Sequence, residues 1–313
     1  MNGSASSPPT PILQALLGNW VDFAGPFPPA SLPLEAAVAR YAGYRRGTDA
    51  WFLGNLVVRV GDVPEVERYL RSHHSAADPS PVPLSIVVGA RWREVPERVQ
   101  QLSASLNLSR IVAIEGKWDD DQAGLWRQLT SDGYRLFVEM TGELPLHEQL
   151  LSIAHVDAAA KLRMGGTETH QIPSPATVAT FLSSCRSCDL PYKLTAGLHH
   201  AWTGDYPLTY DAQSTSARFF GFLPVCVAAL LIESDPTATS AATEVLTDAG
   251  PESIRLDQHG IRWKQHRWTT KDCRHLRAVR LLSVGSCSFE EPLADIRAII
   301  SSEIPKDRST PSP

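Results

Sequence analysis

The chain has 313 residues, of which 43% are hydrophobic and 20% charged, and its formal net charge at pH 7 is −5. This ordinary globular composition can bury a sizeable core, and the length suits a single barrel domain as well as two smaller domains. The 29 basic side chains form no block and are outnumbered by 34 acidic ones, which argues against a nucleic-acid partner.

The chain ends predict no targeting or anchoring segment. Residues 1–11 are rich in Ser and Pro, lack the basic start of a signal peptide, and are expected to be a disordered tail, as are residues 306–313. The longest apolar stretch, Phe219–Ile232, is shorter than the roughly 20 residues that a membrane helix needs, and it is predicted to be a buried helix. We therefore expect a cytoplasmic protein without membrane contact.

Short apolar runs alternate with amphipathic stretches along the chain, a pattern typical of repeated βα units with a parallel sheet. Eight strands are predicted, and they cover Asn19–Gly25, Trp51–Arg59, Leu84–Ala90, Arg110–Gly116, Tyr134–Met140, Val156–Arg163, Pro191–Gly197 and Ala278–Gly285.

The segments between the strands predict helices. The clearest begins after Ser174, a good N-cap followed by a proline at the first helical position. A longer segment separates the seventh and eighth strands and contains a predicted helix at Phe219–Glu233 and a hairpin at Ser253–Lys264. We predict one (β/α)8 TIM barrel over residues 12–305, with this segment as an insertion. An open doubly wound sheet is the structural alternative.

Common cofactor and redox motifs are missing. The sequence contains no GxGxxG, GxxxxGK[ST] or HExxH pattern, so no nucleotide and no cofactor is expected. Cys185 and Cys188 form a lone CxxC without a second pair at zinc spacing, and the five cysteines are interpreted as reduced thiols.

The predicted strands are unusually polar near their C-terminal ends, where TIM barrels place their active sites. The candidate residues from these ends and the loops that follow are Asp22, Glu115, Glu139, Lys161, Arg163, Lys193, Gly197, His199, His200 and Ser286.

Strand periodicity brings two lysines together. Side chains two apart on a strand share a face, so Lys161 and Arg163 point the same way, as do Lys193 and Thr195. If these faces form the interior, mutual repulsion and burial are expected to lower the lysine pKa values. A neutral lysine amine can form a Schiff base with a carbonyl compound, while a neighbouring carboxylate moves protons.

Other roles for the same residues stay open. His199 and His200 with Glu139 or Glu115 could form a metal site for a hydrolase or isomerase, although adjacent side chains on extended backbone point in opposite directions. The barrel could also bind a small anion and catalyse nothing. No base for a Cys287 nucleophile can be placed from the sequence, so loop packing is its default role.

Several short motifs, in order, resemble class I aldolases of the deoxyribose-phosphate aldolase type. The segments that carry the resemblance are VDFAG (21–25), FVEMTGEL (137–144), AKLRMGGTE (160–168), YKLTAGLHH (192–200) and VGSCSF (284–289). The chain also resembles a set of uncharacterised bacterial proteins with KLRxGG, AGLHH and GSCSFxEP segments.

The aldolase resemblance implies roles for individual residues. Lys161 matches the Schiff-base lysine, Lys193 the second lysine that lowers its pKa, and Asp22 the early aspartate. The chain departs from the family in having Arg163 after the first lysine and Glu115 in place of an aspartate near strand four, and His199–His200 replaces a glycine-rich phosphate loop.

Together, these patterns predict a cofactor-independent lyase that uses no metal. Lys161, Lys193, Glu139 and Asp22 are the expected catalytic residues. Substrate binding is assigned to Arg163, Glu115, His199, His200, Gly197 and Ser286. The expected partner is a small carbonyl compound with an anionic group, and a homo-oligomer is left open.

Overall fold

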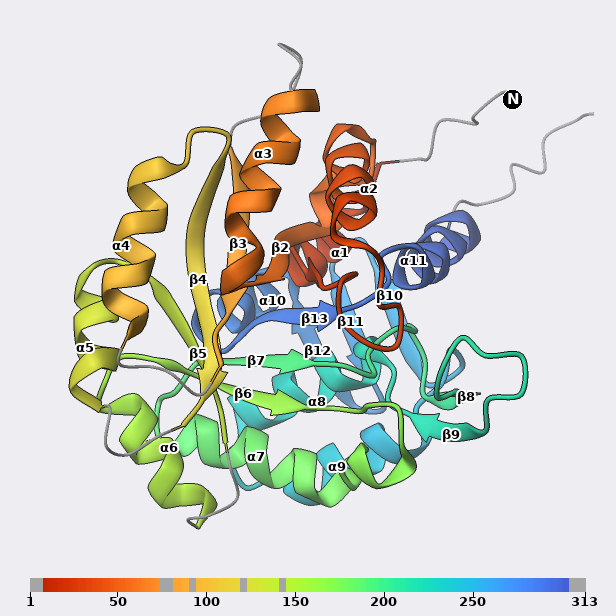
Figure 1. The fold of residues 1–313 in the computed structure, drawn as a ribbon. Coiled ribbons are helices and arrows are strands. Elements are labelled where there is room, and N and C mark those ends of the chain that lie inside the picture. The colour runs from red at the N-terminus through yellow and green to blue at the C-terminus, as the bar shows by residue number, and fades with distance from the viewer. Residues whose placement is uncertain (1–7, 74–80, 90–93, 119–122, 141–144, 304–313) are drawn as a thin grey trace, which may run out of the picture.

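In the computed structural model, residues 8–73, 81–89, 94–118, 123–140 and 145–303 are described. Eight parallel strands close into a barrel in the order β1-β13-β7-β6-β5-β4-β3-β2 (Figure 1). Their bounds are β1 Val21–Phe23, β2 Leu53–Arg59, β3 Val82–Val87, β4 Ser109–Lys117, β5 Arg135–Glu139, β6 Ala159–Arg163, β7 Tyr192–Thr195 and β13 Leu281–Ser286.

The predicted (β/α)8 barrel is confirmed. Strand β1 pairs with β2 on one side and with β13 on the other, so the ring is closed and the open-sheet alternative is wrong. Each predicted strand corresponds to one barrel strand, with shifted ends. The sixth begins at Ala159 instead of Val156 because Asp157 has a φ of 54°, which breaks the extended chain.

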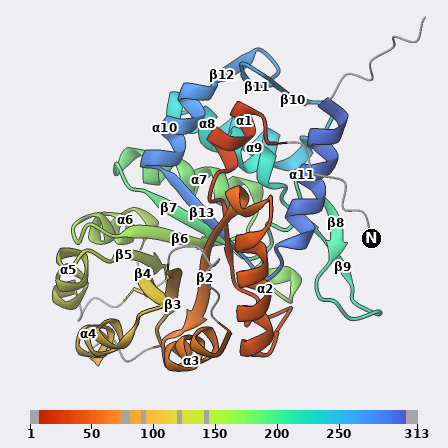
Figure 2. The ribbon, with the colours of Figure 1, turned by 90° about the horizontal axis from the view of Figure 1, so that it is seen from above.

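Helices surround the strands, as the view from above shows (Figure 2). Their bounds are α1 Pro11–Leu17, α2 Leu34–Arg46, α3 Val63–His73, α4 Val95–Ser105, α5 Ala123–Ser131, α6 Leu146–Ala154, α7 Pro175–Ser187, α8 Phe222–Ser234, α9 Thr239–Asp248, α10 Thr270–Val279 and α11 Glu290–Glu303. Short 3₁₀ turns lie at η1 Ala50–Phe52, η2 Val60–Asp62 and η5 Thr169–Gln171.

Helix α7 follows the predicted capping pattern. The Ser174 side chain accepts a hydrogen bond from the Thr177 backbone N–H, and Pro175 occupies the first helical position. The apolar side chains at helical spacing after this cap, including Phe181 and Cys185, are buried.

The insertion between β7 and β13 is confirmed and is richer than predicted. It contains a hairpin of β8 Gly204–Pro207 and β9 Ser216–Phe219, then α8 and α9, and a three-stranded sheet of β10 Ile254–Asp257, β11 Gly260–Trp263 and β12 His266–Thr269. The predicted hairpin corresponds to β10 and β11, whereas β12 was not predicted. Helix α8 is buried along almost its whole length, and it begins at Phe222 because Phe219 belongs to β9.

Some expectations concern residues that the structure does not describe. The predicted tails fall mainly there, in residues 1–7 and 306–313, and helix α1 already begins at Pro11. Ala90 of the third predicted strand and residues 141–144 of the FVEMTGEL segment also lie outside the described residues. Among the described helices, none has the length and apolar character needed to cross a bilayer.

Candidate active site

The side chains of Lys161 and Lys193 both lie inside the barrel. Lys161 of β6 is in register with Lys193 of β7 on one side and with Glu139 of β5 on the other. Two residues further along β6 and β7, toward their C-terminal ends, Arg163 is in register with Thr195. The period of two along each strand therefore places successive charged side chains at increasing height inside the barrel.

A buried layer of ion pairs crosses the barrel interior. The Lys193 side chain is 0% exposed, and its Nζ lies 2.5 Å from Asp22 Oδ2 and 2.7 Å from Glu115 Oε1. Ser85 donates to Glu115 Oε1 at 2.6 Å, and Ser283 donates to Asp22 Oδ2 at 2.8 Å. Each buried carboxylate thus has both a cation and a hydroxyl donor, which is what a charge needs when water is excluded.

The prediction that both lysines have lowered pKa values is wrong for Lys193. Burial alone would lower its pKa, but the attraction and hydrogen bonds of Asp22 and Glu115 outweigh burial, and the pKa is raised. Burial would likewise raise the pKa of Glu115, but Lys193 and Lys161 hold it well below its usual range. The expected repulsion does not arise because Glu115 lies between the two amines.

Lys161 contacts this buried layer through Glu115 but, unlike Lys193, lines a cavity. Its Nζ is 3.0 Å from Glu115 Oε2 and 3.3 Å from Glu139 Oε2, and its side chain is 9% exposed. Glu139, whose side chain is 19% exposed, is also 3.9 Å from Nε of Arg163. Glu115 therefore joins the buried Lys193 to the accessible Lys161 through its two oxygens.

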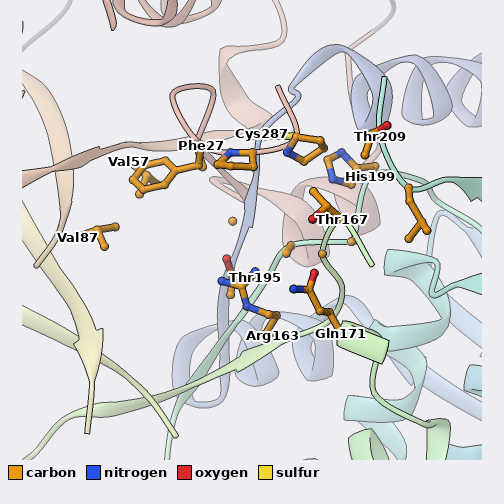
Figure 3. A pocket seen from close by; sticks show the side chains of 18 of the residues that line it. Phe27, Val57, Val87, Arg163, Thr167, Gln171, Thr195, His199, Thr209 and Cys287 are labelled. Atoms are coloured by element: carbon orange, nitrogen blue, oxygen red, sulfur yellow. The ribbon is translucent and has the colours of Figure 1, made fainter. Parts of the chain in front are cut away.

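A cavity of about 1410 Å³ opens above Lys161 at the C-terminal ends of the strands. Arg163, Thr195 and Gln171 lie close together on one side of the cavity, and Val57 and Val87 lie on the other side (Figure 3). Lys117, which sequence reasoning missed, lines the same cavity. It could have been found, because it lies two residues after Glu115 and shares its face.

Not every predicted site residue reaches this cavity. The predicted site residues that line it are Glu115, Glu139, Lys161, Arg163, Gly197, His199 and His200. Asp22, Lys193 and Ser286 are absent from the lining and are almost completely buried. Asp22 and Lys193 therefore support the site from below, and Ser286 contacts His199 instead of a ligand position, at 3.3 Å from its Nδ1.

Gly197 has a structural reason to be glycine. Its φ is 72°, and a Cβ there would lie 2.9 Å from the Met164 carbonyl oxygen and 3.0 Å from the Gly165 Cα. The loops after β6 and β7 consequently pass in close contact at Gly197.

The two histidines take separate carboxylate partners from α11. His199 Nδ1 is 2.9 Å from Glu291 Oε2, and His200 Nδ1 is 3.3 Å from Asp295 Oδ2. His200 also stacks on Tyr206, with ring centroids 3.7 Å apart. Both histidines line the cavity because the chain bends after β7 and is not extended there.

Within the described residues, no group of three or more His, Cys, Asp or Glu side chains is arranged to hold a metal ion. The chain matches no protein-family model and none of the curated proteins with which it was compared. The chemistry of the cavity therefore has to be argued from its own side chains.

Proposed function

We propose that this barrel is an aldolase-like lyase that acts on a small carbonyl compound through a Schiff base on Lys161. The fold is compatible with such an enzyme, since TIM barrels place catalytic groups at the C-terminal strand ends. One observation carries the proposal. Of the two neighbouring lysines Lys161 and Lys193, Lys161 lines the cavity whereas Lys193 does not, and Lys161 has a carboxylate on either side.

The two carboxylates would have different tasks. Glu115 is buried, and Lys193 and Ser85 hold it in place, so it acts as a fixed negative charge. Glu139 is the more exposed carboxylate and can exchange protons with the cavity. We assign to Glu139 the uptake of a proton from the Lys161 ammonium, which frees the amine for attack.

The covalent chemistry then follows from this arrangement. The Lys161 nitrogen adds to the carbonyl carbon, the oxygen leaves as water after protonation, and a positively charged iminium remains between Glu115 and Glu139. In a substrate with a hydroxyl β to the carbonyl, loss of the hydroxyl proton breaks the Cα–Cβ bond and releases an aldehyde. The bonding pair moves to the iminium nitrogen and gives an enamine, which is then protonated and hydrolysed.

The cavity wall near Lys161 suits an anionic substituent. Arg163 and Lys117 both line this region, and the Arg163 side chain is 50% exposed with a single long contact to Glu139. Its guanidinium therefore keeps donors available for a carboxylate or phosphate. We infer that the substrate is a small carbonyl compound that carries one such group.

The metal-dependent hydrolase or isomerase is the weaker candidate. It needs His199, His200 and Glu139 to converge, but each imidazole is oriented by its own carboxylate on α11. A barrel that only binds small anions would share the cationic wall. Anion binding alone does not require an accessible lysine flanked by carboxylates. The experiment below distinguishes an anion-binding barrel from a lyase.

Borohydride trapping tests the proposal, because borohydride reduces an imine to a stable secondary amine. The protein is incubated with glyoxylate, an aldehyde that carries a carboxylate, and borohydride is added. Peptide mapping by mass spectrometry should place the adduct on Lys161. Lys161→Met should abolish this adduct, whereas the matched variant Lys117→Met, which also removes a cavity lysine, should keep it. Labelling of exposed lysines without a preference for Lys161 would refute the proposal.

A further inference from the structure

We propose that Cys287, His199 and Glu291 form a second covalent site in the same cavity, in which the Cys287 thiolate adds to the carbonyl carbon of an aldehyde. This site does not need Lys161. It shares with the proposed function only the class of ligand, a small aldehyde with an anionic group.

Three separate elements bring the groups together. Cys287 directly follows β13, His199 lies in the bend after β7, and Glu291 belongs to the first turn of α11. The side chains of His199 and Cys287 interact, and His199 Nδ1 lies 2.9 Å from Glu291 Oε2. All three residues line the cavity, where His199 and Cys287 are seen above Arg163 (Figure 3).

Cys287, His199 and Glu291 have the arrangement of a nucleophile, its base and the group that orients the base. A thiol needs a base within hydrogen-bond reach, and the base needs a third group that fixes its ring. Tyr210 completes the cluster, because its hydroxyl donates to Glu291 Oε2 at 3.0 Å and lies 3.8 Å from Cys287 Sγ. Ser286 lies 3.3 Å from the same ring nitrogen of His199 and gives it a further polar contact.

The surroundings of His199 favour its protonated form. Burial would lower the pKa of His199, but hydrogen bonds and charge from Cys287 and Glu291 outweigh burial and raise it to about 9. Burial also raises the pKa of Tyr210, which therefore stays a neutral donor. A protonated His199 can give its proton to a carbonyl oxygen as the Cys287 sulfur adds to the carbonyl carbon.

The other four cysteines do not share this setting. Cys185, Cys226 and Cys273 are buried away from the cavity, and burial raises their pKa values. Cys188 lies 3.7 Å from Nδ1 of His147, but burial raises its pKa too, and neither residue lines the cavity. Cys188 with His147 is thus an internal control for a cysteine–histidine contact without the surrounding site.

The addition of the Cys287 thiolate to an aldehyde requires no other reactant. The Sγ–C bond forms as the carbonyl π bond breaks, and its electron pair moves to the carbonyl oxygen. The His199 imidazolium gives its proton to that oxygen, which leaves a neutral thiohemiacetal and a neutral imidazole. The reverse movement releases the aldehyde, so the bond can hold a carbonyl compound without consuming it.

The two nucleophiles lie at different heights in the barrel. Lys161 is in register with Lys193, which is in register with Ser283, whereas Cys287 follows Ser283 by four residues. At about 3.3 Å per residue, Ser286 at the end of β13 is roughly 10 Å further along the strand direction than Ser283, and Cys287 follows it. A ligand bonded to Cys287 therefore occupies a part of the cavity distinct from the surroundings of Lys161.

Alkylation kinetics test the thiolate. The folded protein is treated with iodoacetamide at pH 6, and peptide mapping by mass spectrometry follows Cys287 and Cys188 separately. Because His199 and Glu291 activate the Cys287 sulfur in this proposal, Cys287 should react at least tenfold faster than Cys188. His199→Gln should slow Cys287 about tenfold or more, and Glu291→Gln should shift its pH profile upward, whereas His147→Gln should leave its rate unchanged. Equal rates at Cys287 and Cys188 would overturn the proposal.

Protection by an aldehyde tests the addition. Glyoxylate should slow iodoacetamide labelling of Cys287 reversibly, and it should do so equally in the wild-type chain and in Lys161→Met, after circular dichroism has shown that the variant is folded. Protection that disappears in Lys161→Met, or that is absent from both chains, would overturn this inference. Failure of borohydride trapping at Lys161 would instead refute the proposed lyase and leave this result unaffected.

Discussion

Replacement of Lys193 by Met should destabilise the fold strongly, because it removes the one cation shared by two buried carboxylates. Lys193 Nζ lies 2.5 Å from Asp22 and 2.7 Å from Glu115, which are 1% and 2% exposed. At an effective dielectric constant of about 20, each contact represents roughly 6 kcal/mol of gross attraction. The hydroxyl donors that remain compensate only in part, so we expect the free energy of unfolding to fall by about 3–5 kcal/mol at pH 7.

The fall in the free energy of unfolding caused by Lys193→Met should depend on pH. The lowered pKa of Glu115 stabilises the fold above its ordinary pKa of 4.5, and this contribution disappears as the pH falls through the folded value. The raised pKa of Lys193 stabilises the fold below 10.5, and its contribution is lost as the pH rises through the folded value. The difference between wild type and Lys193→Met should therefore be largest between these limits and shrink in acid.

Urea denaturation followed by circular dichroism, repeated across this pH range, measures the difference. Lys264→Met is the matched control, because it removes an exposed lysine that pairs with Glu244 and should cost less than about 1 kcal/mol. The double variant Asp22→Asn with Lys193→Met should recover part of the lost stability. If Lys193→Met is as stable as Lys264→Met at pH 7, the buried layer is not held by charge pairing and the reasoning is refuted.

Three further outcomes are expected. Arg163→Ala should raise the glyoxylate concentration needed for half-maximal borohydride labelling of Lys161 by about tenfold or more, because a charge-assisted contact to the carboxylate is lost. The limiting rate of labelling should stay unchanged, and a fall in that rate alone would contradict a binding role. Gly197→Ala should lower the free energy of unfolding by about 1–3 kcal/mol in the same urea assay, because φ is 72° and the new Cβ would press on the Met164 carbonyl. Prior treatment with EDTA should leave the Lys161 labelling intact, and loss of labelling that zinc restores would favour the metal-dependent alternative.

The sequence alone determined the barrel and the faces of its strands. Repeated short apolar runs separated by helical segments leave few closed arrangements, and the period of two along a strand fixes which side chains point inward together. For this reason the sequence assigns Lys161 and Arg163 to one face, with Lys193 on the neighbouring strand. Strand ends were less well determined, because local effects such as the positive φ of Asp157 leave little trace in the hydrophobic pattern.

Only the tertiary structure decided which charges meet. Asp22 and Lys193 are 171 residues apart, and they touch because the ring closes through β1 and β13. The same closure inserts Glu115 between the two amines, so an expected repulsion becomes an ion-paired layer and the pKa of Lys193 rises. The base for Cys287 was missed for the same reason. His199 follows β7 and Cys287 follows β13, and these two strands, far apart in the chain, become neighbours only when the barrel closes.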